Sequence, residues 1–134
     1  MSEALEKLEN AFTEETFTRK PLLNYTIKYF TDLSGIINDI NDKKEIESAM
    51  DTAKAQLEKN QQHISALYSI GFLNLKIENY YDMNLDKLLG IFKNAKKWNI
   101  VEYIAQKILD EYYESDYALR YLANYYQISN RETD

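Results

Sequence analysis

The sequence contains only three glycines and one proline among its 134 residues, and this scarcity is its strongest constraint on the fold. Tight turns between β-strands draw heavily on these two residue types, so a fold built from many strand hairpins is disfavoured. Apolar residues instead recur at spacings of three and four along most of the chain, which is the period of an α-helix. The sequence therefore predicts an all-α protein, with about seven helices paired as antiparallel hairpins in a single domain over residues 1–134.

Short polar segments separate the predicted helices, with TEETFTRK as the first connection. The helices are expected over residues 2–12, 21–41, 42–60, 63–78, 85–97, 99–112 and from 115 onward. Two of them begin with capping signals, because Asp42 and Asn99 each stand three residues before a glutamate. The fourth helix, HISALYSIGFLNLKIE, is apolar on nearly every side, so we expect it to be the most deeply buried.

The last predicted helix, which Ser115 opens, carries two apolar stripes. The first consists of Leu119, Leu122, Ala123 and Tyr126, and the second of Ala118, Tyr121 and Tyr125. A solenoid helix packs one face on the preceding helix pair and another on the next. The stripes, together with the segment Leu67-x-x-Ile70-Gly71, favour a TPR-like solenoid start in which the second stripe stays open. On this interpretation the chain is the N-terminal fragment of a longer protein; the alternative is a tyrosine-rich surface helix that ends the protein.

The composition argues against several kinds of function. The net charge of −6 opposes binding to phosphate backbones, so we expect no direct binding of nucleic acid. The absence of cysteine removes thiolate metal ligands, and no segment is apolar enough to predict a signal peptide or a membrane span, so a cytoplasmic protein is expected. His63 is the only histidine and has no nucleophile beside it, which favours a structural role. We therefore expect a non-catalytic protein without a cofactor.

Tyrosines crowd the end of the chain, and four of them form the candidate interaction surface: Tyr113, Tyr117, Tyr121 and Tyr125. Tyrosine is enriched in protein interfaces, although rings of this kind also fill the seams between helices. Acidic residues border the set, and such clusters are usually solvated rather than metal-binding. Exposed apolar side chains seek cover, so self-association through this last helix is also expected.

Three segments carry a resemblance to a known family: LLNYTIKYFTDL, HISALYSIGFL and KKWNIVEYIAQKILDEYYESDYALRYLANYYQ. Together they resemble the N-terminal helical extension of long bacterial GreA-type transcription elongation factors. The resemblance implies a parent protein that binds RNA polymerase and rescues arrested complexes by transcript cleavage. It also implies that acidic residues at the tip of a coiled-coil hairpin in such factors help to hold Mg²⁺ in the polymerase.

Three hypotheses about function remain open. The first is a protein-interaction module within a GreA-type factor, and the second is a stand-alone helical scaffold unrelated to transcription. In the third, the helices joined at DINDKKE form the active hairpin, with Asp39 and Asp42 at its tip. Asp42 is also well placed to cap its own helix, which would occupy its carboxylate. We therefore expect the capping role at this bend.

Overall fold

The computed structural model describes residues 2–18 and 21–133, and every regular element within them is helical. The prediction of an all-α fold with seven α-helices is confirmed. A short 3₁₀ helix, η1, lies between the first two. The elements are α1 (Glu3–Thr18), η1 (Leu22–Asn24), α2 (Ile27–Asn38), α3 (Lys43–Lys59), α4 (Ile64–Lys76), α5 (Asn84–Asn94), α6 (Trp98–Glu111) and α7 (Asp116–Thr133).

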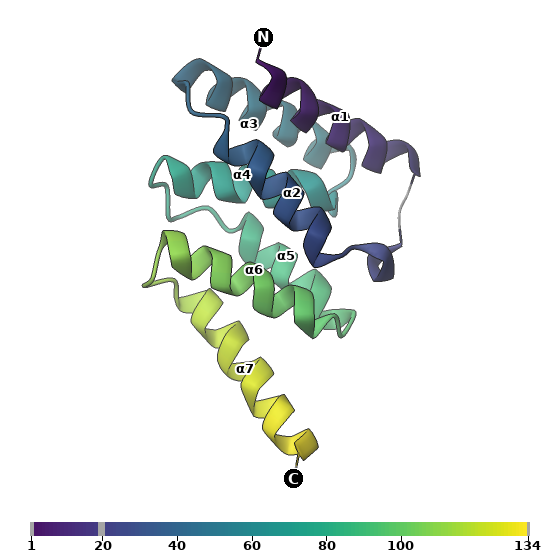
Figure 1. Cartoon of the computed structure of the whole chain (residues 1–134), viewed down its shortest axis with the longest axis vertical. Helices are drawn as coiled ribbons and strands as arrows, with labels where there is room; N and C mark the ends of the chain where they lie inside the picture. The colour runs from purple at the N-terminus through teal and green to yellow at the C-terminus, as the bar shows by residue number, and fades with distance from the viewer. Residues whose placement is uncertain (1, 19–20, 134) are drawn as a thin grey trace.

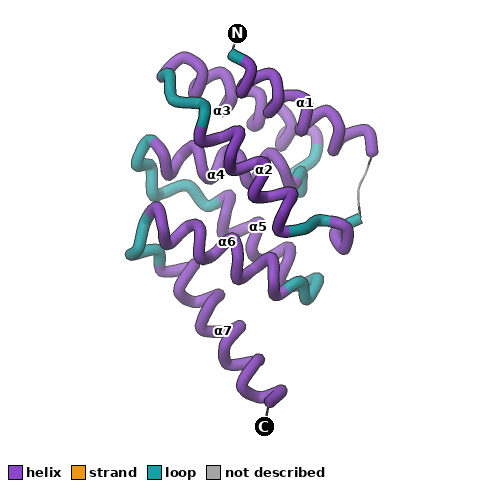
Figure 2. Tube along the Cα trace, viewed as in Figure 1, coloured by secondary structure: helices purple, strands orange, loops and turns teal. Residues whose placement is uncertain are grey.

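The helices stack along the long axis of the molecule, and their connections alternate between two sides (Figure 1). The α2–α3, α4–α5 and α6–α7 connections lie on one side, and the α1–α2, α3–α4 and α5–α6 connections lie on the other (Figure 2). From α3 onward each helix contacts the next one along the chain. This is the arrangement of consecutive helical hairpins. That these hairpins form a TPR-like solenoid remains a prediction.

Helix α4 is the centre of the packing. Every residue from Ile64 to Leu75 is buried, and the helix contacts α1, α2, α3, α5 and α6. Its C-terminal residue, Lys76, donates hydrogen bonds to the carbonyl oxygens of Ile37, Asn38 and Ile40, at 2.7, 3.2 and 2.6 Å. A cation at the C-terminus of a helix complements the partial negative charge there. The expectation that the fourth helix is the most buried is therefore confirmed, and its end also stabilises the end of α2.

Helix α1 continues well past the predicted end at Phe12. The segment TEETFT, expected as a connection, forms its last turns; the remaining two residues of that predicted connection lie outside the described parts. Thr13, Thr16 and Thr18 each donate a hydroxyl hydrogen bond to the carbonyl oxygen four residues earlier, at 2.8–3.0 Å. The prediction was wrong because the stabilising partners of these turns belong to α4, far along the chain.

The helix predicted over residues 21–41 is broken near its start. Pro21 is extended, η1 follows it, and Tyr25 is extended again before α2 begins. The ring of Tyr25 is buried between Phe30 and Phe92, with centroid distances of 6.0 and 6.1 Å. The hydroxyl of Thr26 then caps α2 by accepting a hydrogen bond from the backbone N–H of Tyr29 at 3.1 Å. Burial of an aromatic ring thus overrides the continuous helical pattern of the sequence.

One of the two predicted capping signals is confirmed. The Asp42 carboxylate accepts a hydrogen bond from the backbone N–H of Glu45 at 3.4 Å, and α3 ends at Lys59 with Asn60 as its C-cap, next to the predicted end. The Asn99 cap is wrong, because α6 already begins at Trp98. Lys96 adopts a left-handed conformation with φ of 59°, and the N–H of Lys97 bonds to the carbonyl of Phe92. Because α5 ends in this compact way, the N-cap of α6 is Lys97, two residues before the predicted cap.

The buried face of helix α7 differs from the one expected. Ala118 of the second stripe is fully buried and Leu122 is buried beside it, whereas Leu119, Ala123 and Tyr126 of the first stripe are exposed. The small side chain of Ala118 lets α7 approach α6 closely, and the helix also contacts α5. The expectation that the second stripe stays open is therefore wrong: the open apolar positions are Leu119 and Tyr126.

Two glycines offer a test of the packing around α4. A Cβ atom added at Gly71 would lie 2.3 Å from Cγ of Leu85, whereas one added at Gly35 would meet nothing within 4 Å. We predict that Gly71→Ala lowers the free energy of unfolding by about 1–3 kcal/mol, because overpacking exceeds the gain in helix propensity.

The matched control is Gly35→Ala, which removes the same glycine flexibility without a collision. It should raise the free energy of unfolding by about 0.5–1 kcal/mol, as measured by urea denaturation. Equal stabilisation by both substitutions would contradict the close contact between α4 and α5.

Candidate functional site

The most polar part of the interior lies where α1 meets the first turn of α4. The Glu15 carboxylate accepts hydrogen bonds from the backbone N–H groups of Ile64 and Ser65, at 2.5 and 2.9 Å. It also accepts one from the hydroxyl of Ser65 at 2.7 Å, and Tyr29 bonds to that same hydroxyl. The first N–H groups of a helix have no partner within the helix and carry partial positive charge. Glu15 is therefore a capping residue for α4 supplied by another helix.

His63 occupies the N-cap position of α4 and is almost completely buried. Its Nδ1 accepts a hydrogen bond from the backbone N–H of Ala66 at 3.2 Å and lies 3.1 Å from a carboxylate oxygen of Glu15. Its Nε2 lies 3.1 Å from the carbonyl oxygen of Phe12 and 3.2 Å from the hydroxyl of Thr16. Both ring nitrogens hold helices together, so the predicted structural role is confirmed.

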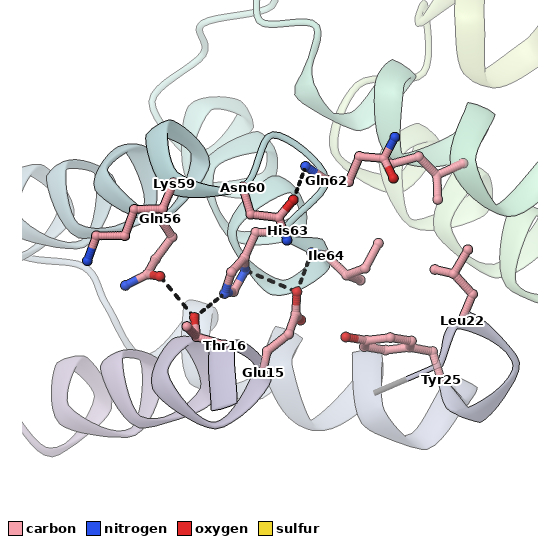
Figure 3. Close-up of a pocket in the computed structure, with 11 residues that line it drawn as sticks. Glu15, Thr16, Leu22, Tyr25, Gln56, Lys59, Asn60, Gln62, His63 and Ile64 are labelled. Atoms are coloured by element: carbon pink, nitrogen blue, oxygen red, sulfur yellow. Dashed lines mark hydrogen bonds and ion pairs between the residues drawn. The ribbon is translucent and has the colours of Figure 1, made fainter. Parts of the chain in front are cut away.

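A cavity of about 460 Å³ adjoins these residues. Figure 3 shows Glu15 and Thr16 projecting from α1 toward His63 and Ile64 at the start of α4, with Leu22 and Tyr25 along one wall. Burial, followed by the charge of Glu15, raises the pKa of the Tyr25 hydroxyl well above its ordinary value. Acid–base or nucleophilic catalysis needs a group that can reach a substrate. Here the carboxylate and the imidazole are already bonded to backbone atoms, so the junction stabilises the fold.

The structure divides the four tyrosines of the candidate interaction surface. Tyr113 is 76% exposed and lies in the α6–α7 connection. Tyr117 is half-buried, and burial raises its pKa to about 12. The hydroxyl of Tyr121 donates to the carbonyl oxygen of Asp86 at 3.4 Å, and the ring of Tyr125 stacks on Trp98 at 5.8 Å. Three of the four therefore help to join α7 to α5 and α6, and Tyr113 alone is largely open to a partner.

Sequence reasoning missed a second set of exposed apolar side chains around the α4–α5 connection: Ile77, Tyr80, Tyr81 and Met83. The segment NYYDMN looked like an ordinary turn because it is rich in polar residues. Its one signal was the pair of adjacent tyrosines, which have no apolar periodicity to bury them.

Within the described ranges, no group of three or more histidine, aspartate or glutamate side chains is arranged to hold a metal ion. The helices of the same residues are all too short or too polar to cross a bilayer. The two aspartates of the proposed hairpin tip differ in their roles. Asp42 is the N-cap of α3, and Asp39 ends α2, where its charge opposes the lowering of the pKa of Lys76 by burial.

The chain is similar in sequence to two GreA-related proteins. It is 32% identical over 130 residues to the transcription elongation factor GreA of Borreliella burgdorferi. It is 31% identical over 113 residues to a putative GreA-associated domains protein of Treponema pallidum. The resemblance to GreA-type factors is confirmed. The aligned parts cover 97% and 84% of this chain, but the chain spans only 14% and 17% of the length of these curated relatives.

No protein-family model and no solved structure matches the chain. The likeness to GreA-related proteins therefore comes from sequence identity along a segment of each relative.

The Glu15 contacts lead to a prediction about stability. Glu15→Gln should lower the free energy of unfolding by about 2–4 kcal/mol, because it removes a charge that accepts three hydrogen bonds and turns an amide group toward backbone N–H donors. Thermal denaturation followed by circular dichroism measures the change.

The neighbouring Glu14→Gln serves as the control, since Glu14 is exposed on the same helix. It should change the free energy of unfolding by no more than about 0.5 kcal/mol. A similar small effect for both variants would show that Glu15 does not cap α4.

Proposed function

We propose that this chain is a non-catalytic protein-interaction module of a GreA-type transcription elongation factor, acting with bacterial RNA polymerase. The observation that carries the proposal is the 32% identity to GreA of Borreliella burgdorferi over 97% of this chain. Because that match covers 14% of the relative, the activity of the whole relative does not transfer to this chain.

The side chains available for chemistry support a binding role. The buried carboxylate and the only histidine are occupied by the first turn of α4. Most of the exposed large apolar side chains instead lie in the connections between helices. Loops that a rigid scaffold positions commonly bind partners. This distribution favours recognition of another protein over catalysis.

We predict that the chain binds purified bacterial RNA polymerase core enzyme with a dissociation constant on the order of micromolar, as expected for a surface of single-module size. Biolayer interferometry with the immobilised chain measures the affinity. An unrelated acidic helical protein of similar size and charge controls for non-specific attraction. Absence of binding above that control would contradict the proposal.

The active-hairpin alternative is tested by the double variant Asp39→Asn with Asp42→Asn. Asparagine is still a good N-cap, so the free energy of unfolding should change by no more than about 1 kcal/mol. In stalled polymerase complexes, we expect neither the unaltered chain nor this variant to stimulate transcript cleavage. Cleavage that the unaltered chain stimulates and the variant does not would instead assign the activity to the α2–α3 hairpin.

A further inference from the structure

Five of the nine exposed large apolar side chains in the described residues lie on just two connections, α4–α5 and α6–α7. These five residues, called here the aromatic end, are Ile77, Tyr80, Tyr81, Met83 and Tyr113. Their exposed fractions run from 38% for Tyr80 to 94% for Tyr81. A concentration of exposed apolar side chains of this kind marks a binding surface more often than isolated exposed residues do.

The two connections form one surface, and Figure 1 shows them on the same side of the molecule. The rings of Tyr80 and Tyr112 stack face to face, with centroids 4.0 Å apart and planes 8° from parallel. This stack joins the α4–α5 connection to the end of α6. An open groove of about 660 Å³ continues from Ile77 between α3 and α4, over the apolar side chains of Met50 and Ile70. The aromatic end therefore offers both projecting rings and an adjoining apolar groove.

The two segments that carry the aromatic end are rich in carboxylates. Residues 77–84 and 108–119 contain six carboxylates and no lysine or arginine, and Lys76, Lys107 and Arg120 stand immediately outside these ranges. The pKa of the Tyr112 hydroxyl is raised first by burial and then by the carboxylates of Glu114 and Asp116, so these charges lie close to the stacked rings. On the groove side, burial raises the pKa of the Asp82 carboxyl, and the positive charge of Lys54 opposes that rise.

This negative charge restricts which kinds of partner can bind the aromatic end. Nucleic acid and anionic lipid would be repelled. A second copy docked through the same surface would bring like charges together. The last turn of α5 and the α5–α6 connection of another copy carry Lys93, Lys96 and Lys97 but no exposed large apolar side chain to fill the groove. A segment with both cationic and apolar side chains would complement this surface. Its lysine or arginine side chains would pair with the carboxylates, and cations also bind favourably over exposed tyrosine rings.

We propose that the aromatic end docks a basic, amphipathic segment of a partner protein. This inference rests on the proposed function, since it specifies which face of the interaction module binds and the chemistry of what it binds. The apolar side chains of the partner segment enter the groove beside Ile77, and its cations lie over Tyr81 and Tyr113 among the surrounding carboxylates.

The probe is a fluorescent peptide of leucine and lysine in an amphipathic order, compared with a peptide that has glutamate in place of lysine. We expect the lysine peptide to bind with a dissociation constant on the order of micromolar and more weakly as salt rises. Its amide shift changes in ¹H–¹⁵N spectra should centre on residues 77–84 and 108–119. The glutamate peptide should not bind.

The double variant Tyr81→Ala with Tyr113→Ala should weaken binding of the lysine peptide by at least about tenfold. Both side chains are largely exposed, so the fold should be unaffected. The matched control, Phe17→Ala with Tyr126→Ala, also removes two exposed rings, one near the end of α1 and one in α7. It should leave the affinity unchanged.

The charge contribution is tested with Glu78→Gln and Glu114→Gln together, which should weaken binding several-fold, against Glu14→Gln near the end of α1, which should not. Equal weakening by the controls, shift changes spread over the whole surface, absence of binding, or a dimer that Tyr81→Ala with Tyr113→Ala dissolves would each overturn the inference.

Polymerase binding is measured with the same variants. Retained polymerase binding without peptide binding would overturn this inference alone, whereas peptide binding at the aromatic end without polymerase binding would overturn the assigned polymerase partner alone.

Discussion

The structure depends on helix α4, which is buried from Ile64 to Leu75, so its first N–H groups cannot be satisfied by water. Its N-terminal N–H groups are bonded by the Glu15 carboxylate of α1 and by the His63 ring. At the other end, Lys76 extends to three carbonyl groups at the end of α2. Since unpaired polar groups at a buried helix end cost several kcal/mol, these contacts decide where α1 and α2 can lie. The remaining helices then pack in sequence on this core.

The same constraint determines where function can reside. The titratable groups most suited to chemistry, Glu15 and His63, are used to complete α4, so the interior is committed to stability. Charge and exposed aromatic surface are instead distributed over the connections. Carboxylates are the charged residues of the α4–α5 and α6–α7 connections, whereas Lys96 and Lys97 lie in the α5–α6 connection on the opposite side, with Lys93 in the last turn of α5 (Figure 1). This distribution supports the proposed role in binding another protein.

Local signals in the sequence were sufficient for the helix content, for the burial of α4 and for the Asp42 cap, because periodicity and capping depend on residues within a few positions. The failures over α1, α2 and α7 involve partners distant in sequence. Helix α1 extends to Thr18 because Glu15 bonds to α4, and the second predicted helix breaks because Tyr25 packs against Phe92. Likewise, the buried face of α7 is selected by α5 and α6, and both of its stripes looked equally apolar. The aromatic end was missed because exposed rings on a polar turn have no periodicity.

Native-state hydrogen exchange tests the central claim, that α4 is the structural centre and that its ends are bonded by α1 and α2. The account predicts that the interior amides of α4 exchange only through global unfolding, with protection matching the free energy of unfolding from denaturation. Amides of α7, which packs on the body through one face, should exchange through smaller openings. The backbone amides of Ile64 and Ser65, which are bonded to Glu15, should be protected almost as strongly as the α4 interior. If α4 exchanged as readily as α7, or if its first amides exchanged like those of an exposed helix end, α4 would not be the element on which the fold depends.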